Sequence, residues 1–175
     1  MRNSFFMIAA AALAACQIAE PIPPVPQGLS MPAPMVSPSD FDLVLGDEWT
    51  GELTYLDYSS GETVAIPATL SVGPVDGRTV NYAFGYPGEP QANNSGTWTI
   101  SGDGQMIDDK PVTSRINGDE GEVILIMEYT GEDNDEPADI TESLILSANG
   151  IVMTKQVKTQ SAERPFQRNS FAFSR

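Results

Sequence analysis

The chain has 175 residues and a formal net charge of −15 at pH 7, with 24 acidic and 9 basic side chains. An acidic excess of this size opposes binding to nucleic acid and to anionic lipid surfaces, and it favours solubility and basic or cationic partners. The absence of histidine excludes Ser-His-Asp and Cys-His catalysis and histidine-based zinc sites. No P-loop, Gly-x-Ser-x-Gly or Gly-x-Gly-x-x-Gly motif is present, so we expect a protein that is not an enzyme and has no cofactor.

Residues 1–15, MRNSFFMIAAAALAA, predict a signal peptide. A single basic residue, Arg2, precedes an apolar run from Phe5 to Ala15. This run is well short of the roughly 20 residues that cross a membrane as a helix. The segment is therefore expected to be removed rather than to remain as a membrane span.

The segment ends in Leu-Ala-Ala followed by Cys16, the only cysteine of the chain. This sequence resembles the lipobox of bacterial lipoproteins. The resemblance implies that a diacylglycerol is attached to Cys16, that cleavage occurs just before it, and that acyl chains then anchor the protein to a membrane. Gln17, in place of the aspartate that tends to hold such proteins in the inner membrane, suggests the outer membrane. A plain secretory signal and a cytosolic amphipathic helix are the alternatives.

Residues 16–39 are rich in proline and carry almost no charge. Such a segment buries too little apolar surface to fold, and its prolines favour extended polyproline II. At roughly 3 Å per residue it would hold a domain up to about 70 Å from the membrane. We predict a tether, with a proline-rich docking motif as the alternative.

Residues 40–175 form one domain in which short strands follow one another. Apolar and polar residues alternate in most of these strands, and no 3.6-residue apolar period is sustained after the signal peptide. The turns between them carry glycine, and Asn149-Gly150 predicts a two-residue hairpin turn. The predicted strands are 49–58, 62–72, 78–86, 95–100, 111–116, 122–129, 139–146, 151–159 and 166–174.

This pattern predicts an all-β fold. Hairpins in sequence favour an up-and-down antiparallel meander, and eight or nine such strands tend to close into a barrel, which removes their exposed edges. A β-sandwich is the alternative. A tryptophan in the first strand, Trp49, resembles that of lipocalins and the wider calycin barrels, although these show Gly-x-Trp where this chain has GDEW from Gly46. The segment WTGELTYLDYSSGE is also similar to the start of small bacterial lipoprotein domains.

Two groups of carboxylates are candidates for chemistry. Residues 132–139, EDNDEPAD, offer oxygen ligands but lack the spacing of an EF-hand, so a solvated hairpin loop is expected and weak calcium binding is the alternative. Asp108 and Asp109 resemble a glycosidase pair only in being two neighbouring carboxylates. We expect no metal site and no catalytic residue.

A binding cavity is the remaining candidate site. Aromatic residues with polar tips share apolar strand faces, and one lysine lies on such a face; together they suit an amphiphile with an anionic head group. Filling of the barrel by these side chains is the alternative. The candidate lining residues are Trp49, Tyr55, Tyr82, Trp98, Tyr129 and Lys155.

Three functions agree with these observations. The first is a lipid-anchored envelope protein that binds a small hydrophobic or amphipathic molecule in its barrel. The second is an acidic interaction module with a basic protein partner, such as a cell-wall hydrolase that it inhibits. The third is a structural accessory of the envelope.

Overall fold

The computed structural model describes residues 35–175, which contain one ten-stranded antiparallel sheet and two short 3-10 helices, η1 (Pro38–Val44) and η2 (Pro90–Ala92). The predicted signal peptide, Cys16 and most of the predicted tether lie outside the described residues. The strands are β1 (Gly46–Asp57), β2 (Glu62–Asp76), β3 (Thr79–Gly85), β4 (Asn94–Thr99), β5 (Met106–Ile107), β6 (Lys110–Asn117), β7 (Val123–Asp133), β8 (Glu136–Leu146), β9 (Gly150–Thr159) and β10 (Phe166–Ser174).

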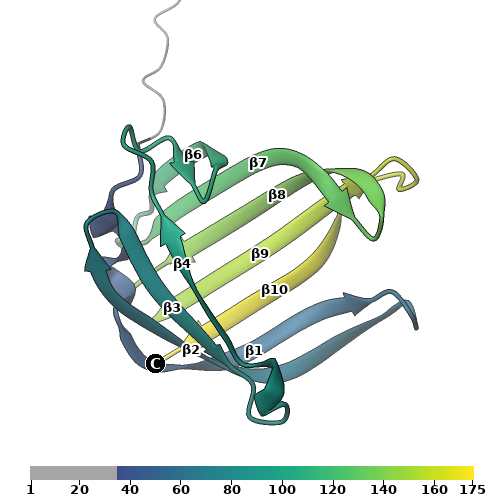
Figure 1. Cartoon of the computed structure of the whole chain (residues 1–175), viewed down its shortest axis with the longest axis horizontal. Coiled ribbons are helices and arrows are strands. Elements are labelled where there is room, and N and C mark those ends of the chain that lie inside the picture. The colour runs from purple at the N-terminus through teal and green to yellow at the C-terminus, as the bar shows by residue number, and fades with distance from the viewer. Residues whose placement is uncertain (1–34) are drawn as a thin grey trace, which may run out of the picture. The chain divides into compact units, whose positions relative to one another are not determined.

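The sheet curls into a nearly closed barrel. Its strand order is β4-β3-β2-β1-β10-β9-β8-β7-β6-β5, so the first strand of the chain pairs with the last. Figure 1 shows β7 to β10 side by side, β1 below β10, and β3 and β4 curving back in front of them. The two ends of the sheet meet at one bridge, between Ile100 and Ile107, and the Asp108 amide donates to the Thr99 carbonyl over 2.9 Å.

The prediction of an all-β antiparallel meander is confirmed, and a single sheet excludes the β-sandwich. The number of strands differs, because ten are present rather than eight or nine. The additional strand is β5, whose two residues are too few to show an alternating pattern.

Two hairpin turns differ from their predictions. Asn134 and Asp135 have φ values of 51° and 64°, so they form a tight two-residue turn, and β7 and β8 run through most of the acidic segment 132–139. That segment is therefore a hairpin of paired strands rather than a solvated loop. Gly150 is not among the residues with positive φ, and it already belongs to β9. The turn before it is centred on Ala148 and Asn149, since Ser147 donates its amide to the Gly150 carbonyl.

Helix η1 plugs one end of the barrel. The helix begins with a capping box. In it the Ser37 side chain accepts a hydrogen bond from a backbone amide, and the Asp40 carboxylate accepts one from the Ser37 amide over 2.9 Å. Phe41 is fully buried and stacks on Trp98 with ring centroids 5.2 Å apart. Asp40 also binds Arg115 of β6 through two hydrogen bonds of 2.6 and 2.9 Å. Folded structure thus begins before Asp40, a few residues earlier than the sequence predicted.

Strand register arranges the barrel interior in layers, because side chains of one face recur every second residue. Next to η1 lies a filled floor layer. An apolar layer follows the floor layer, and a third layer contains four polar side chains. We name the floor layer (Val123, Leu146, Ile151, Phe173, Gly51, Ala68), the apolar layer (Leu125, Leu144, Met153, Phe171, Leu53, Ile66) and the polar layer (Met127, Glu142, Lys155, Asn169, Tyr55, Val64).

Candidate functional site

A cavity of about 220 Å³ lies inside the barrel, beyond the filled floor layer. We call it the central cavity. Side chains of the apolar layer form one part of its wall, aromatic rings from β3 and β4 form another, and charged side chains lie around both. Its lining residues are Tyr82, Phe84, Trp98, Ile107, Asp108, Lys110, Met127, Glu142, Ser143, Leu144, Met153, Thr154, Lys155, Asn169 and Phe171.

Four polar side chains of the polar layer follow one another across four neighbouring strands. Glu142 of β8 pairs with Lys155 of β9, Lys155 with Asn169 of β10, and Asn169 with Tyr55 of β1. Directly opposed side chains on one sheet face have Cβ atoms about 5 Å apart, so each polar group lies within reach of the next. We call these four residues the polar row. The next layer toward η1 contains only apolar side chains.

Glu142 already has strong partners. Its carboxylate lies 2.7 Å from the Lys110 ammonium and accepts a 2.5 Å hydrogen bond from the Tyr129 hydroxyl. The Lys110 ammonium lies 5.5 Å from the centre of the Tyr129 ring. Burial raises the pKa of Tyr129, and the hydrogen bond to Glu142 raises it further, since ionisation would place a phenolate beside a carboxylate. Tyr129 is therefore neutral at physiological pH.

A second ionic cluster lies beyond the polar row, around the buried carboxylate of Asp133. It accepts a hydrogen bond from the Tyr58 hydroxyl and lies 3.4 Å from the Lys155 ammonium and 3.6 Å from Nε of Arg168. The Arg168 guanidinium also stacks over the Tyr58 ring, 4.4 Å from its centre. Burial, followed by the hydrogen bond to Asp133, raises the pKa of Tyr58 to about 12. The cluster links the end of β1 to the end of β7 across the barrel.

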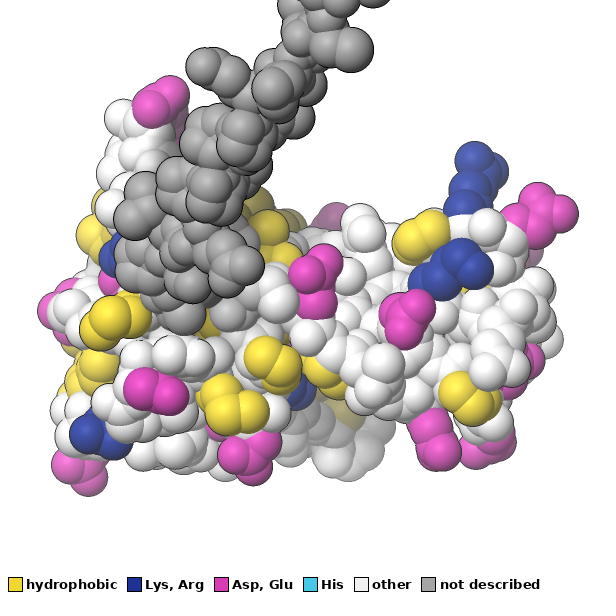
Figure 2. All heavy atoms as spheres, turned by 90° about the horizontal axis from the view of Figure 1, so that it is seen from above, with side chains coloured by type: hydrophobic (Ala, Val, Ile, Leu, Met, Phe, Trp, Pro, Cys, Tyr) yellow, Lys and Arg dark blue, Asp and Glu magenta, His cyan; other side chains and the backbone are white. Residues whose placement is uncertain are grey.

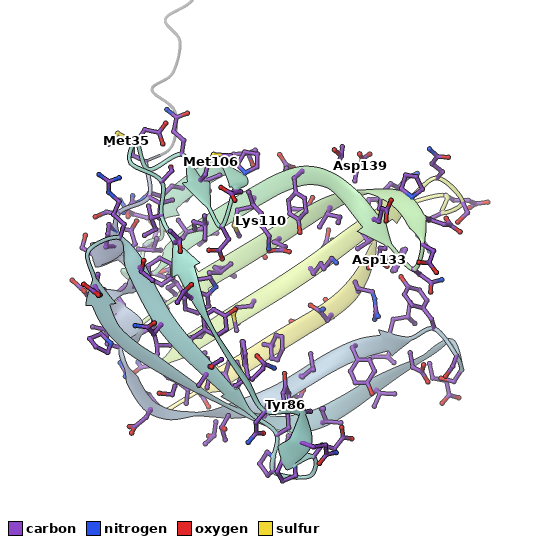
Figure 3. All side chains as sticks on the ribbon, in the orientation of Figure 1. Met35, Tyr86, Met106, Lys110, Asp133 and Asp139 are labelled. Carbon is purple, nitrogen blue, oxygen red and sulfur yellow. The ribbon has the colours of Figure 1, made fainter. Side chains whose placement is uncertain are left out.

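Figure 3 shows how charged residues divide between the two sides of the sheet. Lys110, at the start of β6, and Asp133, at the end of β7, point to the interior, whereas Asp139 of β8 points away from it. The alternation within β7 and β8 accounts for this division, because odd residues of β7 and even residues of β8 face inward.

A second hollow of about 380 Å³ adjoins the central cavity, and we call it the side cavity. The two share Asn169 and Phe171 as lining residues. Tyr86, which lies next to η2, lines the side cavity, and Figure 3 shows it at the bottom of the view. The full lining of the side cavity is Leu53, Tyr55, Ile66, Tyr86, Glu89, Ala92, Asn94, Arg168, Asn169 and Phe171.

Four of the six predicted lining residues line one of the two hollows. Tyr82, Trp98 and Lys155 line the central cavity, and Tyr55 lines the side cavity. The ring centroids of Tyr82 and Trp98 are 4.5 Å apart, so the two side chains form one aromatic wall.

The other two predicted residues lie elsewhere. Trp49 is fully buried beside η1, where its indole nitrogen donates to the Val44 carbonyl over 2.8 Å and the Arg175 guanidinium covers its ring at 4.2 Å. It belongs to the packed core and lines neither of the two hollows. Tyr129 lies on the inner face, where it contacts two lining residues through its hydrogen bond to Glu142 and its ring below the Lys110 ammonium.

Three polar residues of the site were not predicted from the sequence. Glu142 and Asn169 share strand faces with Leu144 and Phe171, so the alternating pattern contained a signal for both, namely a polar side chain on an otherwise apolar face. Lys110 is the first residue of β6 and lies just before the predicted strand 111–116, so the alternating pattern did not indicate which way its side chain faces.

The neighbouring carboxylates Asp108 and Asp109 have a structural role. They occupy the two central positions of the β5–β6 turn, with φ values of 50° and 63°. The Asp108 carboxylate accepts the Thr99 amide hydrogen over 2.7 Å and so helps to join β4 to β5. Among residues 35–175 no group of three or more potential metal ligands of the Asp, Glu, Cys or His type comes together.

Figure 2 shows acidic side chains scattered over one face among basic and apolar groups, with no single acidic patch. Within the described part of the chain no helix is long and apolar enough to cross a membrane.

The fold of this chain is a nearly closed ten-stranded antiparallel barrel, and the chain is similar in fold to a solved structure. This is Rv2717c from M. tuberculosis, with a TM-score of 0.53, 8% sequence identity, and coverage of 81% of this chain and 99% of the other. At this identity the likeness concerns the fold alone. No protein-family model and no curated protein matches the chain.

Proposed function

We propose that this protein is a non-enzymatic binding protein that holds a small hydrophobic or amphipathic molecule inside its barrel. The observation that carries the proposal is the central cavity, which lies between an apolar layer and a row of polar side chains. Ligand sites in proteins are mostly apolar hollows with a few well-placed polar groups.

The proposal includes a lipid anchor and a location. Residues 13–16, Leu-Ala-Ala-Cys, resemble a lipobox, which supports acylation of Cys16 and attachment to the bacterial envelope. Gln17 supports the outer membrane as the location. The meander and its near closure support placing the barrel among the calycin-like folds. A tethered barrel of this kind would collect or deliver a poorly soluble molecule close to the membrane.

The experiment that tests binding is titration with N-phenyl-1-naphthylamine, a neutral apolar fluorophore. Met153 lines the cavity, so Met153→Phe should fill part of it and weaken binding on the order of tenfold. The matched control is Val152→Phe, which introduces the same side chain at the adjacent residue. Val152 faces the other side of β9. The control should bind the fluorophore as the unmodified protein does.

Each outcome decides the proposal. Saturable binding that is weakened by Met153→Phe and kept by Val152→Phe supports it, provided that both variants melt as cooperatively as the parent protein. No saturable binding to the parent protein, or equal weakening by both variants, would overturn it. The acidic interaction module with a basic partner, which rests on the net charge of −15, would then become the leading account.

A further inference from the structure

The polar row contains two hydrogen-bond donors that face each other across neighbouring strands, Lys155 and Asn169. Both side chains line the central cavity, and Asn169 also lines the side cavity. An ammonium group donates hydrogen bonds only, and an amide group adds two further donors. The pair therefore offers several donors to one point of the cavity wall, immediately beside the apolar layer.

Lys155 is held loosely by its carboxylate partner. Its ammonium lies 3.4 Å from the Asp133 carboxylate, whereas charge-assisted hydrogen bonds between such groups are usually about 2.7–2.9 Å long. Lys110, in contrast, lies 2.7 Å from Glu142. Of the two lysines that line the cavity, Lys155 is thus the one that a bound anion would draw away at the lower cost.

Asp133 would keep a cationic partner if Lys155 turned toward a ligand. Nε of Arg168 lies 3.6 Å from the same carboxylate, and the Tyr58 hydroxyl donates to it. Without such compensation, the buried carboxylate would oppose any movement of Lys155, because an unpaired buried charge is costly. Two cations share this one carboxylate, so one of them can turn away while the other stays beside it.

The amide of Asn169 is the second element. Its side chain makes no hydrogen bond within residues 35–175, although it is half-buried between the two hollows. A polar side chain in such a position gains from a ligand that accepts a hydrogen bond. The adjacent wall, formed by Leu144, Met153 and Phe171, would receive an apolar chain.

We propose that the ligand is an amphipathic carboxylate whose head group binds between the Lys155 ammonium and the Asn169 amide. This inference rests on the proposed function and adds the chemical class of the ligand. The alkyl chain lies against the apolar layer and the aromatic rings of Tyr82 and Trp98. A volume of about 220 Å³ accommodates roughly seven groups the size of a water molecule, at about 30 Å³ each, so a medium-length chain fits the central cavity.

The test compares two ligands with chains of equal length, octanoate and octan-1-ol, as competitors of bound N-phenyl-1-naphthylamine. Octanoate should displace the fluorophore at a concentration on the order of tenfold lower than octan-1-ol, because only the carboxylate forms an ion pair with Lys155. Lys155→Met should remove most of this preference. The control is Lys158→Met, which removes a lysine of the same strand whose ammonium binds the Ala162 carbonyl, and it should keep the preference.

The outcomes separate this inference from the proposed function. If the fluorophore binds but octanoate displaces it no better than octan-1-ol, the carboxylate site is refuted and the apolar binding function stands. A preference for octanoate that survives Lys155→Met refutes the assignment of Lys155. Failure of the fluorophore to bind at all refutes both proposals. Asn169→Leu provides a second variant, and it should also reduce the preference for octanoate.

Discussion

Lys155 and Asn169 face each other across β9 and β10 inside the barrel, one layer above the apolar side chains of Met153 and Phe171. This relationship gives the cavity a polar side and an apolar side. It arises from register alone, because inward-facing residues two apart on the same strands fall in successive layers. The proposed function and the proposed ligand class both depend on it.

The first prediction concerns the pairing of β1 with β10. A Cβ atom at Gly51 would lie 1.8 Å from the Ala172 carbonyl oxygen, which is backbone and cannot move aside without breaking the pairing. Gly51→Ala should therefore lower the free energy of unfolding by about 3 kcal/mol or more. Urea denaturation measures the change. Gly88→Ala is the control, since a Cβ there meets nothing within 4 Å, and its effect should be small; equal effects of the two substitutions would contradict the close approach.

The second prediction concerns the plug formed by η1. Asp40 is buried and binds Arg115 through two hydrogen bonds, so Asp40→Asn leaves the guanidinium without its charged partner. The expected loss of unfolding free energy is about 3 kcal/mol. The double variant Asp40→Asn with Arg115→Met should recover part of this loss, because it removes both charges. Additive losses in a double-mutant cycle would show that the two residues do not act as a pair.

The third prediction concerns high pH. The pKa of Tyr58 is raised to about 12 in the folded protein, whereas tyrosine in an unfolded chain ionises near pH 10. The folded state therefore retains the proton that the unfolded state loses. The contribution of the Tyr58 hydroxyl to the stability of the folded state is fully present below pH 10 and is lost as the pH rises from 10 toward 12.

Absorbance of the phenolate at high pH tests this directly. The parent protein should show a tyrosine step well above pH 10 that is missing in Tyr58→Phe, and its stability should fall more steeply over this range than that of the variant. Tyr129 contributes a further late step, because burial and Glu142 raise its pKa too. Ionisation of all tyrosines together near pH 10 would show that neither hydroxyl is held as described.

The fourth prediction concerns the anchor. If Cys16 carries the acyl chains, Cys16→Ser should release the protein from the membrane fraction, since two or three chains are needed for firm attachment. Fractionation followed by mass measurement of the detergent extract gives the answer. Cys16 is the only cysteine of the chain, so the substitution cannot remove a disulfide within it. Unchanged partitioning of the variant would contradict the lipobox interpretation.

The sequence allowed most of the barrel to be predicted, because alternation marks a strand wherever one side faces a core. Trp98 and Lys155 could be placed on inner faces in this way. The pattern failed at β5, which has two residues, and at the acidic hairpin, where the charged and polar residues 130–138 were not predicted to belong to strands. For Trp49, alternation indicated an inward-facing side chain but not how far along the barrel the filled core extends.

The clusters around Asp133 and Glu142 could not be predicted for a different reason. Asp133 meets Tyr58, 75 residues earlier in the chain, and Glu142 meets Lys110, 32 residues earlier. Contacts of this kind follow from strand order and register in space. A single sequence shows neither the strand order nor the register.

The measurement that tests the central claim most directly is native mass spectrometry of the protein purified from the cells that make it and released by proteolysis within the proline-rich segment. We predict a mass above that of the polypeptide, with the excess removed by organic extraction and matching an amphipathic carboxylate. A bare polypeptide mass under equally gentle conditions would contradict the claim that the barrel carries a ligand.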